Sequence, residues 1–484
     1  MHKVLKGFRG YNDTMDADAV RPYQLAKNSQ NVITTDGGLV ETRRGLTALG
    51  ATLGAGAVVG VYRGYMWGQT SNAIFRLGTP LTQDSTPRLV AVGGTTYAAW
   101  TGSGWTTLGT VTSGAMPCFE TFVSEEYDYI VLTNGTNAPL RWRGQFGTTA
   151  ATFTAPTQRF AFVQEFQRFL FLLRGQTDPR LMKFSSDADM TNWPAYHEYR
   201  IDDAITGVKR FAEALTIHTE RAIYTLRGTG IDTFTLTKSI VASGAVAQNT
   251  IVETPWGLFY LGAEGPYLWQ GGSQAQYLGG AIQSLLADLS FDYRHLSSAA
   301  LKEGRYIFLS MPIGSSQTSC NRTIRLDLER GIWDAPQTTG FASMSQADRG
   351  GDPNRLYAGA TTGGKVYILD EGTSDDGVAI DAIAEFVAQV DDANVRKARF
   401  RKYRVYAKGN DIFNITPLYR DEIDATRTTM GPIGLTTAYN EQDVKINGAA
   451  QGKYLVPGFR CNTLDARMTI KHVECEYEPF GVER

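Results

Sequence analysis

The strongest constraint in this sequence is a regular rhythm of short strand-like runs. β-Branched, aromatic and aliphatic residues gather in short runs that end at Gly, Pro, Asn or Asp, and the turn signals recur about every 8–12 residues. This rhythm predicts an all-β chain folded as a sandwich, a barrel or a propeller. The runs in the first part of the chain cover residues 58–63, 72–77, 88–92, 95–100, 118–123, 128–132, 140–143, 159–164, 168–173 and 180–184.

Three later segments, 215–226, 257–270 and 355–369, repeat one hairpin pattern. Each is an apolar strand, a short polar or Gly-containing turn and a second apolar strand. Such a hairpin cannot bury its faces alone, and radial stacking of four-stranded blades supplies the neighbours it needs. At about 40–50 residues per blade, residues 55–377 predict a β-propeller of six to eight blades, with stacked sandwiches as the alternative.

The character of the chain changes near residue 377. Residues 370–377 are rich in charge and turn formers and indicate a domain boundary. Longer strands follow, so residues 378–484 predict a C-terminal β-sandwich that serves as an interface domain. Residues 1–54 are interpreted as an extended segment that closes onto the propeller. Helix is expected only at 281–289, where apolar residues share one face.

The strand expected at 467–477 contains an irregularity. Its apolar side changes parity between Ile470 and Val473. One extra residue, a β-bulge near Lys471 and His472, would place both apolar sets on the same side of the sheet. The pattern then suits an antiparallel sheet with one wet face.

Composition narrows the functional classes. Lys and Arg total 47 against 49 Asp and Glu, a net charge of −2, which argues against a protein held to DNA or to an anionic membrane mainly by its overall charge. The 51 glycines among 484 residues fit a chain with many turns. No apolar run approaches the roughly 20 residues of a membrane-spanning helix, and the start of the sequence lacks the apolar core of a secretory signal.

The four cysteines are far apart and form no C-x-x-C pair. We expect buried thiols, in a protein made in a reducing cytosol. These cysteines are Cys118, Cys320, Cys461 and Cys475.

The search for catalytic motifs finds two near matches, at residues 359–365 and 185–193. The first resembles a phosphate-binding loop, but Val366 stands where the loop needs Ser or Thr and a strand follows, so a hairpin turn is predicted. The second resembles the Asp box of sialidase-type propellers, with Asp189 in place of its Gly, and this box is a structural turn. The five histidines show no metal-ligand spacing. The sequence therefore predicts no catalytic, cofactor-binding or metal-binding residue, and a protein that is not an enzyme.

A basic run with interleaved aromatics stands out at residues 396–408. One interpretation is an edge strand or subunit interface, whose charges prevent stray strand pairing. Contact with the acidic surface of a partner and contact with nucleic acid are the other two. The candidate interface residues are Arg399, Arg401, Lys402 and Arg404.

Residues 26–45 carry a family resemblance. An Asn followed by hydrophobic residues, a turn with Gly-Gly-Leu and an Arg-x-Gly before the first blade resemble the opening of the tail nozzle proteins of short-tailed phages, also described as tail tubular or packaged-DNA-stabilising proteins. Residues 184–218 and 240–246 are similar to the mid-chain rhythm of that family. Arg44 stands where related chains often carry Pro.

The resemblance implies a virion protein with a propeller and an added sandwich, usually assembled as a homohexameric ring below the portal and adaptor. That ring extends the DNA conduit, retains the packaged genome and passes it during ejection. The implied partners are the adaptor or portal-side protein, the tail fibre, spike or needle components and double-stranded DNA in the lumen. The implied location is the virion tail, assembled in the host cytoplasm. The alternative is a sialidase-like propeller that hydrolyses or binds glycans, which predicts Arg, Tyr and carboxylates clustered at one mouth of the propeller.

Overall fold

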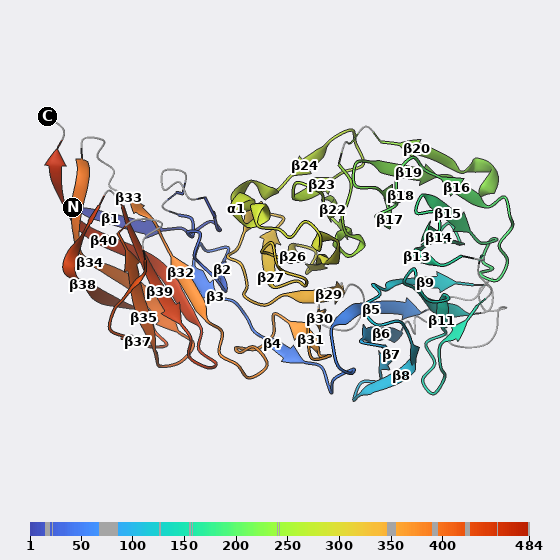
Figure 1. The fold of residues 1–484 in the computed structure, drawn as a ribbon. Coiled ribbons are helices and arrows are strands. Elements are labelled where there is room, and N and C mark those ends of the chain that lie inside the picture. The colour runs from blue at the N-terminus through green and yellow to red at the C-terminus, as the bar shows by residue number, and fades with distance from the viewer. Residues whose placement is uncertain are drawn as a thin grey trace.

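The structure is a computed structural model that describes residues 1–482 except 15–19, 22, 67–85, 125–126, 154–155, 157, 240, 242, 346–354, 390–394, 422–425 and 453. The run expected at 72–77 lies outside the described residues. A β-propeller and a β-sandwich lie side by side, and both ends of the chain are in the sandwich (Figure 1). The predicted fold class is confirmed, and the propeller has seven four-stranded blades.

Six blades are consecutive along the chain, and each is an antiparallel sheet whose first strand lies at the hub (Figure 1). The blades are β5 to β8 (Val58–Met66, Thr86–Gly93, Thr96–Trp100, Trp105–Thr110), β9 to β12 (Cys118–Val123, Asp128–Thr133, Leu140–Trp142, Ala151–Thr152), β13 to β16 (Phe160–Phe166, Phe169–Gly175, Leu181–Phe184, Glu198–Arg200), β17 to β20 (Gly207–Phe211, Ala214–His218, Ile223–Arg227, Thr235–Lys238), β21 to β24 (Val252–Thr254, Gly257–Leu261, Pro266–Trp269, Ala275–Tyr277) and β25 to β28 (Ser298–Lys302, Tyr306–Met311, Arg322–Asp327, Ile332–Trp333).

The seventh blade closes the ring with a strand from the N-terminal segment. Its first three strands are β29 (Phe341–Ser345), β30 (Leu356–Ala360) and β31 (Val366–Leu369), and its fourth is β4 (Leu46–Ala48). β4 pairs antiparallel with β31. Backbone hydrogen bonds between distant parts of the sequence therefore hold the propeller closed.

The three predicted hairpins are each the central pair of strands in a blade, β18 with β19, β22 with β23 and β30 with β31. The near match to a phosphate-binding loop supplies the turn between β30 and β31, as expected. The predicted helix is present in shorter form, as the 3-10 turn η4 (Gly279–Ile282) and α1 (Gln283–Ala287).

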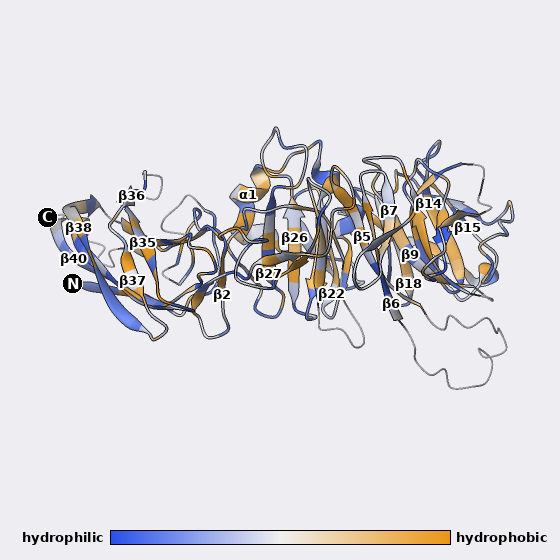
Figure 2. Ribbon diagram, turned by 90° about the horizontal axis from the view of Figure 1, so that it is seen from below, coloured by the Kyte–Doolittle hydropathy of each residue, from blue (hydrophilic) through white to orange (hydrophobic). Residues whose placement is uncertain are grey.

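Apolar side chains fill the spaces between neighbouring blades. The third and fourth blades, for example, share a core in which Phe166, Phe171 and Leu215 are fully buried. Seen edge-on, the strands of the blades are largely apolar (Figure 2). Because each blade covers the apolar face of the next, the propeller needs no separate central core.

The sandwich is built from two sheets and includes three strands of the N-terminal segment. One sheet has the order β2-β3-β40-β34-β38, with β1 also paired to β40, and we call it the long sheet. The other has the order β32-β39-β35-β36, with β33 on β39 and β37 on β35. The strands are β1 (His2–Lys6), β2 (Val32–Thr34), β3 (Val40–Thr42), β32 (Ala382–Glu385), β33 (Ala388–Gln389), β34 (Val395–Gly409), β35 (Phe413–Arg420), β36 (Thr428–Thr429), β37 (Ile433–Leu435), β38 (Asn440–Gly452), β39 (Tyr454–Cys461) and β40 (Met468–Val482).

The predicted bulge is confirmed in β40. His472 lies opposite Tyr406 while Ile470 lies opposite Ala407, so Lys471 is the extra residue. Ile470 and Val473 are both fully buried, as predicted for a bulge that places the two apolar sets on the same side of the sheet.

Candidate functional sites

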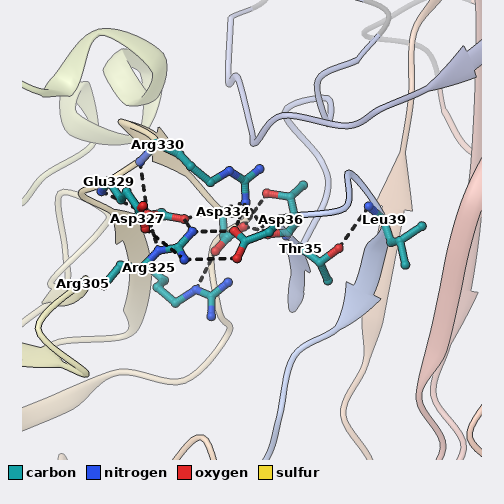
Figure 3. Close-up of polar contacts among 10 residues, drawn as sticks. Thr35, Asp36, Leu39, Arg305, Arg325, Asp327, Glu329, Arg330 and Asp334 are labelled. Atoms are coloured by element: carbon teal, nitrogen blue, oxygen red, sulfur yellow. Dashed lines mark hydrogen bonds and ion pairs between the residues drawn. The ribbon is translucent and has the colours of Figure 1, made fainter.

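The junction between the two domains contains a polar network with a buried centre, beside hydrophobic residues of both domains that pack into one cluster (Figure 3). Asp334, just after the last strand of the sixth blade, accepts a hydrogen bond from Arg325 Nε at 2.6 Å. Its other oxygen accepts from the backbone N–H and the hydroxyl of Thr34, at 2.7 and 3.0 Å. Asp334 and Thr34 are both buried. One carboxylate therefore binds both domains at once.

A second set of ion pairs surrounds this contact. Arg305 Nη2 lies 2.5 Å from Asp36 of the β2–β3 turn, and Arg305 Nε donates to Asp327 at 2.9 Å. Arg330 Nη1 donates to the backbone carbonyl of Thr34 at 3.1 Å. Hydrogen bonding from Arg305 holds the pKa of Asp36 below its ordinary value. These contacts fix the sandwich against the sixth blade (Figure 3).

The predicted interface residues lie on β34, and one part of their interpretation is wrong. β34 is not an edge strand, because it pairs with β40 on one side and β38 on the other. Arg399 and Arg401 are exposed, whereas Lys402 and Arg404 are half-buried. The structure brings all four onto one sheet.

Carboxylates on the neighbouring strands pair with these basic residues. Arg401 is 2.9 Å from Glu478, and Lys402 is 2.9 Å from Glu476. Arg404 Nε donates to Asp443 at 2.6 Å, and this contact lowers the pKa of Asp443. The partners come from β40 and β38, so the segment that looks basic in the sequence lies in a sheet of mixed charge.

The hub of the propeller contains a cavity of about 530 Å³. First strands of several blades line it. The polar and charged lining residues include Tyr62, Arg63, Lys209, Glu253, Ser343 and Ser345.

Glu120, on the first strand of the second blade, is the most perturbed carboxyl near this cavity. Gln164 Nε2 of the third blade donates to it at 2.6 Å. Burial raises the pKa of Glu120 to about 8, and the nearby Lys209 opposes part of this shift. Sequence reasoning missed Glu120, since an isolated Glu on a strand carries no local signal.

The four cysteines are free and buried, as predicted. Burial raises the pKa of Cys118 and of Cys320 to about 12, so both thiols stay protonated at neutral pH. Within the described ranges, no three His, Cys, Asp or Glu side chains come together as metal ligands. The same part of the chain contains no helix with the length and apolar character to cross a bilayer.

The segment that resembles an Asp box forms a tight turn between β15 and β16. Asp189 accepts hydrogen bonds from the backbone and hydroxyl of Thr191, at 2.8 and 2.7 Å. Trp193 Nε1 donates to the carbonyl of Met190 at 2.8 Å. These contacts agree with the predicted structural turn.

No protein-family model and no curated protein matches the sequence. Among solved structures, the computationally designed Ika8 protein is similar at 10% identity, covering 67% of this chain and 99% of that chain, with a TM-score of 0.39. BamB from Moraxella catarrhalis is similar at 12% identity, covering 70% of this chain and 96% of that chain, with a TM-score of 0.38. Similarities at this level of sequence identity and TM-score support no conclusion about function.

Proposed function

We propose that this chain is a structural, non-catalytic subunit of the tail nozzle of a short-tailed phage. Copies join in a ring, with six the expected number, that extends the DNA conduit below the portal and adaptor. The ring retains packaged DNA and passes it during ejection, and it contacts the adaptor or portal-side protein and the fibre, spike or needle components. The chain acts in the virion tail after assembly in the host cytoplasm.

The observation that carries this proposal is the rigid connection between two unlike domains. The N-terminal segment supplies strands to both, and Asp334 with its partners fixes one to the other. A closed ring of identical subunits needs heterologous contacts, in which one patch of each copy meets a different patch of the next. A stiff unit with a propeller at one end and a sandwich at the other offers two such unlike surfaces.

Under this proposal the DNA does not pass through the propeller hub. The hub cavity of about 530 Å³ has the volume of a small-molecule site, and a DNA duplex does not fit in it. The conduit is then the space enclosed by the ring of subunits, and each propeller is part of its wall.

Mass photometry of the purified chain, alone and with the adaptor protein of the same phage, tests the proposal. We expect particles of six times the 53.1-kDa chain mass. A monomer under every condition, with no binding to the adaptor, would contradict it.

The interface role of the basic residues is tested by reversal of their charge. We expect the Arg399→Glu, Arg401→Glu, Lys402→Glu and Arg404→Glu quadruple variant to impair particle assembly. A matched variant that also carries Asp443→Lys, Glu476→Lys and Glu478→Lys restores the pairs within the sheet. If this compensated variant assembles normally, the four residues act only inside their own subunit and the interface role is wrong.

A second candidate function is supported by the hub. Glu120 follows the lining residue Phe119, and its raised pKa, near 8, is suited to a general acid of a glycosidase, while Tyr62, Arg63 and Lys209 line the cavity itself. Turnover of a glycan by the purified monomer, abolished in Glu120→Gln, would favour this enzyme over the nozzle. Turnover that persists in Glu120→Gln would exclude Glu120 as its acid.

A further inference from the structure

The second blade carries a cluster of arginines on aromatic rings that the sequence pattern did not reveal. We call Tyr127, Tyr129, Arg141 and Arg143 the blade-two patch. The guanidinium carbon of Arg141 lies 5.0 Å from the centre of the Tyr129 ring, and that of Arg143 lies 4.6 Å from the centre of the Tyr127 ring. The two rings meet edge to face at 6.3 Å. The result is two adjacent cation–π pairs, formed by β10, β11 and the residues next to their ends.

The positive charges of this patch are not neutralised by the carboxylates of the described residues. Arg143 donates to the neutral side chain of Gln145 at 2.6 and 3.2 Å. Neither Arg141 nor Arg143 forms an ion pair with an Asp or Glu in the part of the chain that the structure describes. Arg401 and Arg404 of the long sheet, in contrast, are each paired with a carboxylate.

The strand geometry spaces and directs the two charges. Arg141 lies on β11 and Arg143 directly follows its last residue, and their guanidinium groups lie over the rings of Tyr129 and Tyr127. Arg143 is exposed and Arg141 half-buried. A guanidinium stacked on a ring keeps its N–H donors in its own plane, where they suit a phosphate, and stacking lowers the entropy lost when it binds one.

A third arginine flanks the patch from the neighbouring blade. The guanidinium carbon of Arg88 lies 4.7 Å from the centre of the Phe146 ring, and its Nε donates to the carbonyl of Gly144 at 2.8 Å. The loop after β11 therefore lies among three guanidiniums.

We propose that the blade-two patch contacts the phosphate backbone of duplex DNA; the inference rests on the proposed nozzle function. Contacts to phosphate do not depend on the base sequence. They therefore suit a site past which every part of a genome must move. Two charges per subunit add only a small counterion-release term, which lets the DNA slide while it is held.

Fluorescence anisotropy with a short labelled DNA duplex at a series of salt concentrations tests the inference. The Arg141→Gln/Arg143→Gln variant is compared with Arg200→Gln/Arg210→Gln, which removes the same charge from two exposed arginines of the third and fourth blades that are already paired with carboxylates. We expect the patch variant to bind DNA on the order of tenfold more weakly at low salt, and the slope of log K against log salt to fall by about 1.8, the value for two phosphate contacts. The control variant should have much smaller effects on the DNA affinity and on the salt slope. Thermal unfolding verifies that both variants are folded.

Equal effects of the two variants, or no change in slope, would overturn the inference. A sulfated polysaccharide serves as the second probe. If it binds through Arg141 and Arg143 while DNA does not bind, the patch recognises an anionic glycan and the DNA assignment is wrong. Mass photometry measures ring formation separately. A ring that does not bind DNA would contradict only this inference, whereas a chain that stays monomeric would contradict the proposed function.

Discussion

At the scale of single residues, the surroundings of a charged group decide what it can do. Glu120 and Asp36 are both acidic, yet burial raises the pKa of the first while Arg305 lowers that of the second. A raised pKa means that the folded state disfavours the carboxylate. The contribution of Glu120 to stability is then most favourable below the ordinary pKa of a Glu and is lost as the pH rises through about 8.

Replacing Glu120 with Gln should remove this dependence. The amide cannot ionise, so we expect Glu120→Gln to raise the melting temperature by about 2–4 °C at pH 9, with a gain that shrinks toward pH 5. Differential scanning calorimetry across this range measures it. Glu253→Gln, an exposed carboxyl that lines the same hub, is the control and should change little. A gain in Glu120→Gln that does not vary with pH would refute the explanation.

The environment of a residue could be predicted where it follows from the chemistry of that residue type. It could not be predicted where it depends on partners that are distant in the sequence. The cysteines were expected to be buried because a thiol packs as a small apolar group, and they are. The neutralisation of the basic run was hidden, since Arg404 meets Asp443 39 residues away and Arg401 meets Glu478 77 residues away. Glu120 and the blade-two patch likewise depend on side chains from separate strands.

At the scale of elements, the local sequence pattern predicted features within one strand, but it did not predict which strands pair with one another. The alternation that revealed the bulge at Lys471 is a property of one strand. Whether β34 lies at an edge depends on β38 and β40, which follow it in sequence, and the edge interpretation was wrong. The same reason hid the role of β4, three residues that complete the seventh blade.

The closure of the propeller by β4 is open to a direct test. Leu49 N–H bonds to the Val366 carbonyl, so by antiparallel alternation Thr47 N–H faces Ile368. Thr47→Pro removes this donor, and we expect a loss of at least about 1 kcal/mol in the free energy of unfolding together with faster proteolysis. Urea denaturation and limited proteolysis measure the two effects.

Thr47→Val is the matched control. Thr47 is exposed and Val keeps both the N–H and the strand preference, so stability should stay within about 0.5 kcal/mol of the original. If the Pro variant is as stable and as resistant as the Val variant, β4 is not needed to close the ring of blades.

At the scale of the whole molecule, a buried polar network reinforces a domain junction that a shared hydrophobic cluster also spans. Asp334 is the centre of the network, with Arg325 on one side and Thr34 on the other. Removing one partner of a buried ion pair leaves the other charge uncompensated, a cost of about 3–5 kcal/mol.

We expect Asp334→Ala to lose about 3–5 kcal/mol in the free energy of unfolding, measured by urea denaturation. Asp36→Ala is the comparison, because the Asp36 side chain is 66% exposed and an exposed pair is worth about 0–1 kcal/mol. Similar losses in the two variants would show that burial of Asp334 does not set the strength of the junction.

The long sheet of the sandwich joins opposite ends of the sequence. β1 pairs with β40 along residues 472–476, although nearly the entire chain separates them. During translation β1 must wait until β40 has been made, and until then its hydrogen-bonding edge has no native neighbour. A chain that stops short of β40 can never finish this sheet, so in a premature product the edge of β1 that normally pairs with β40 stays without its partner.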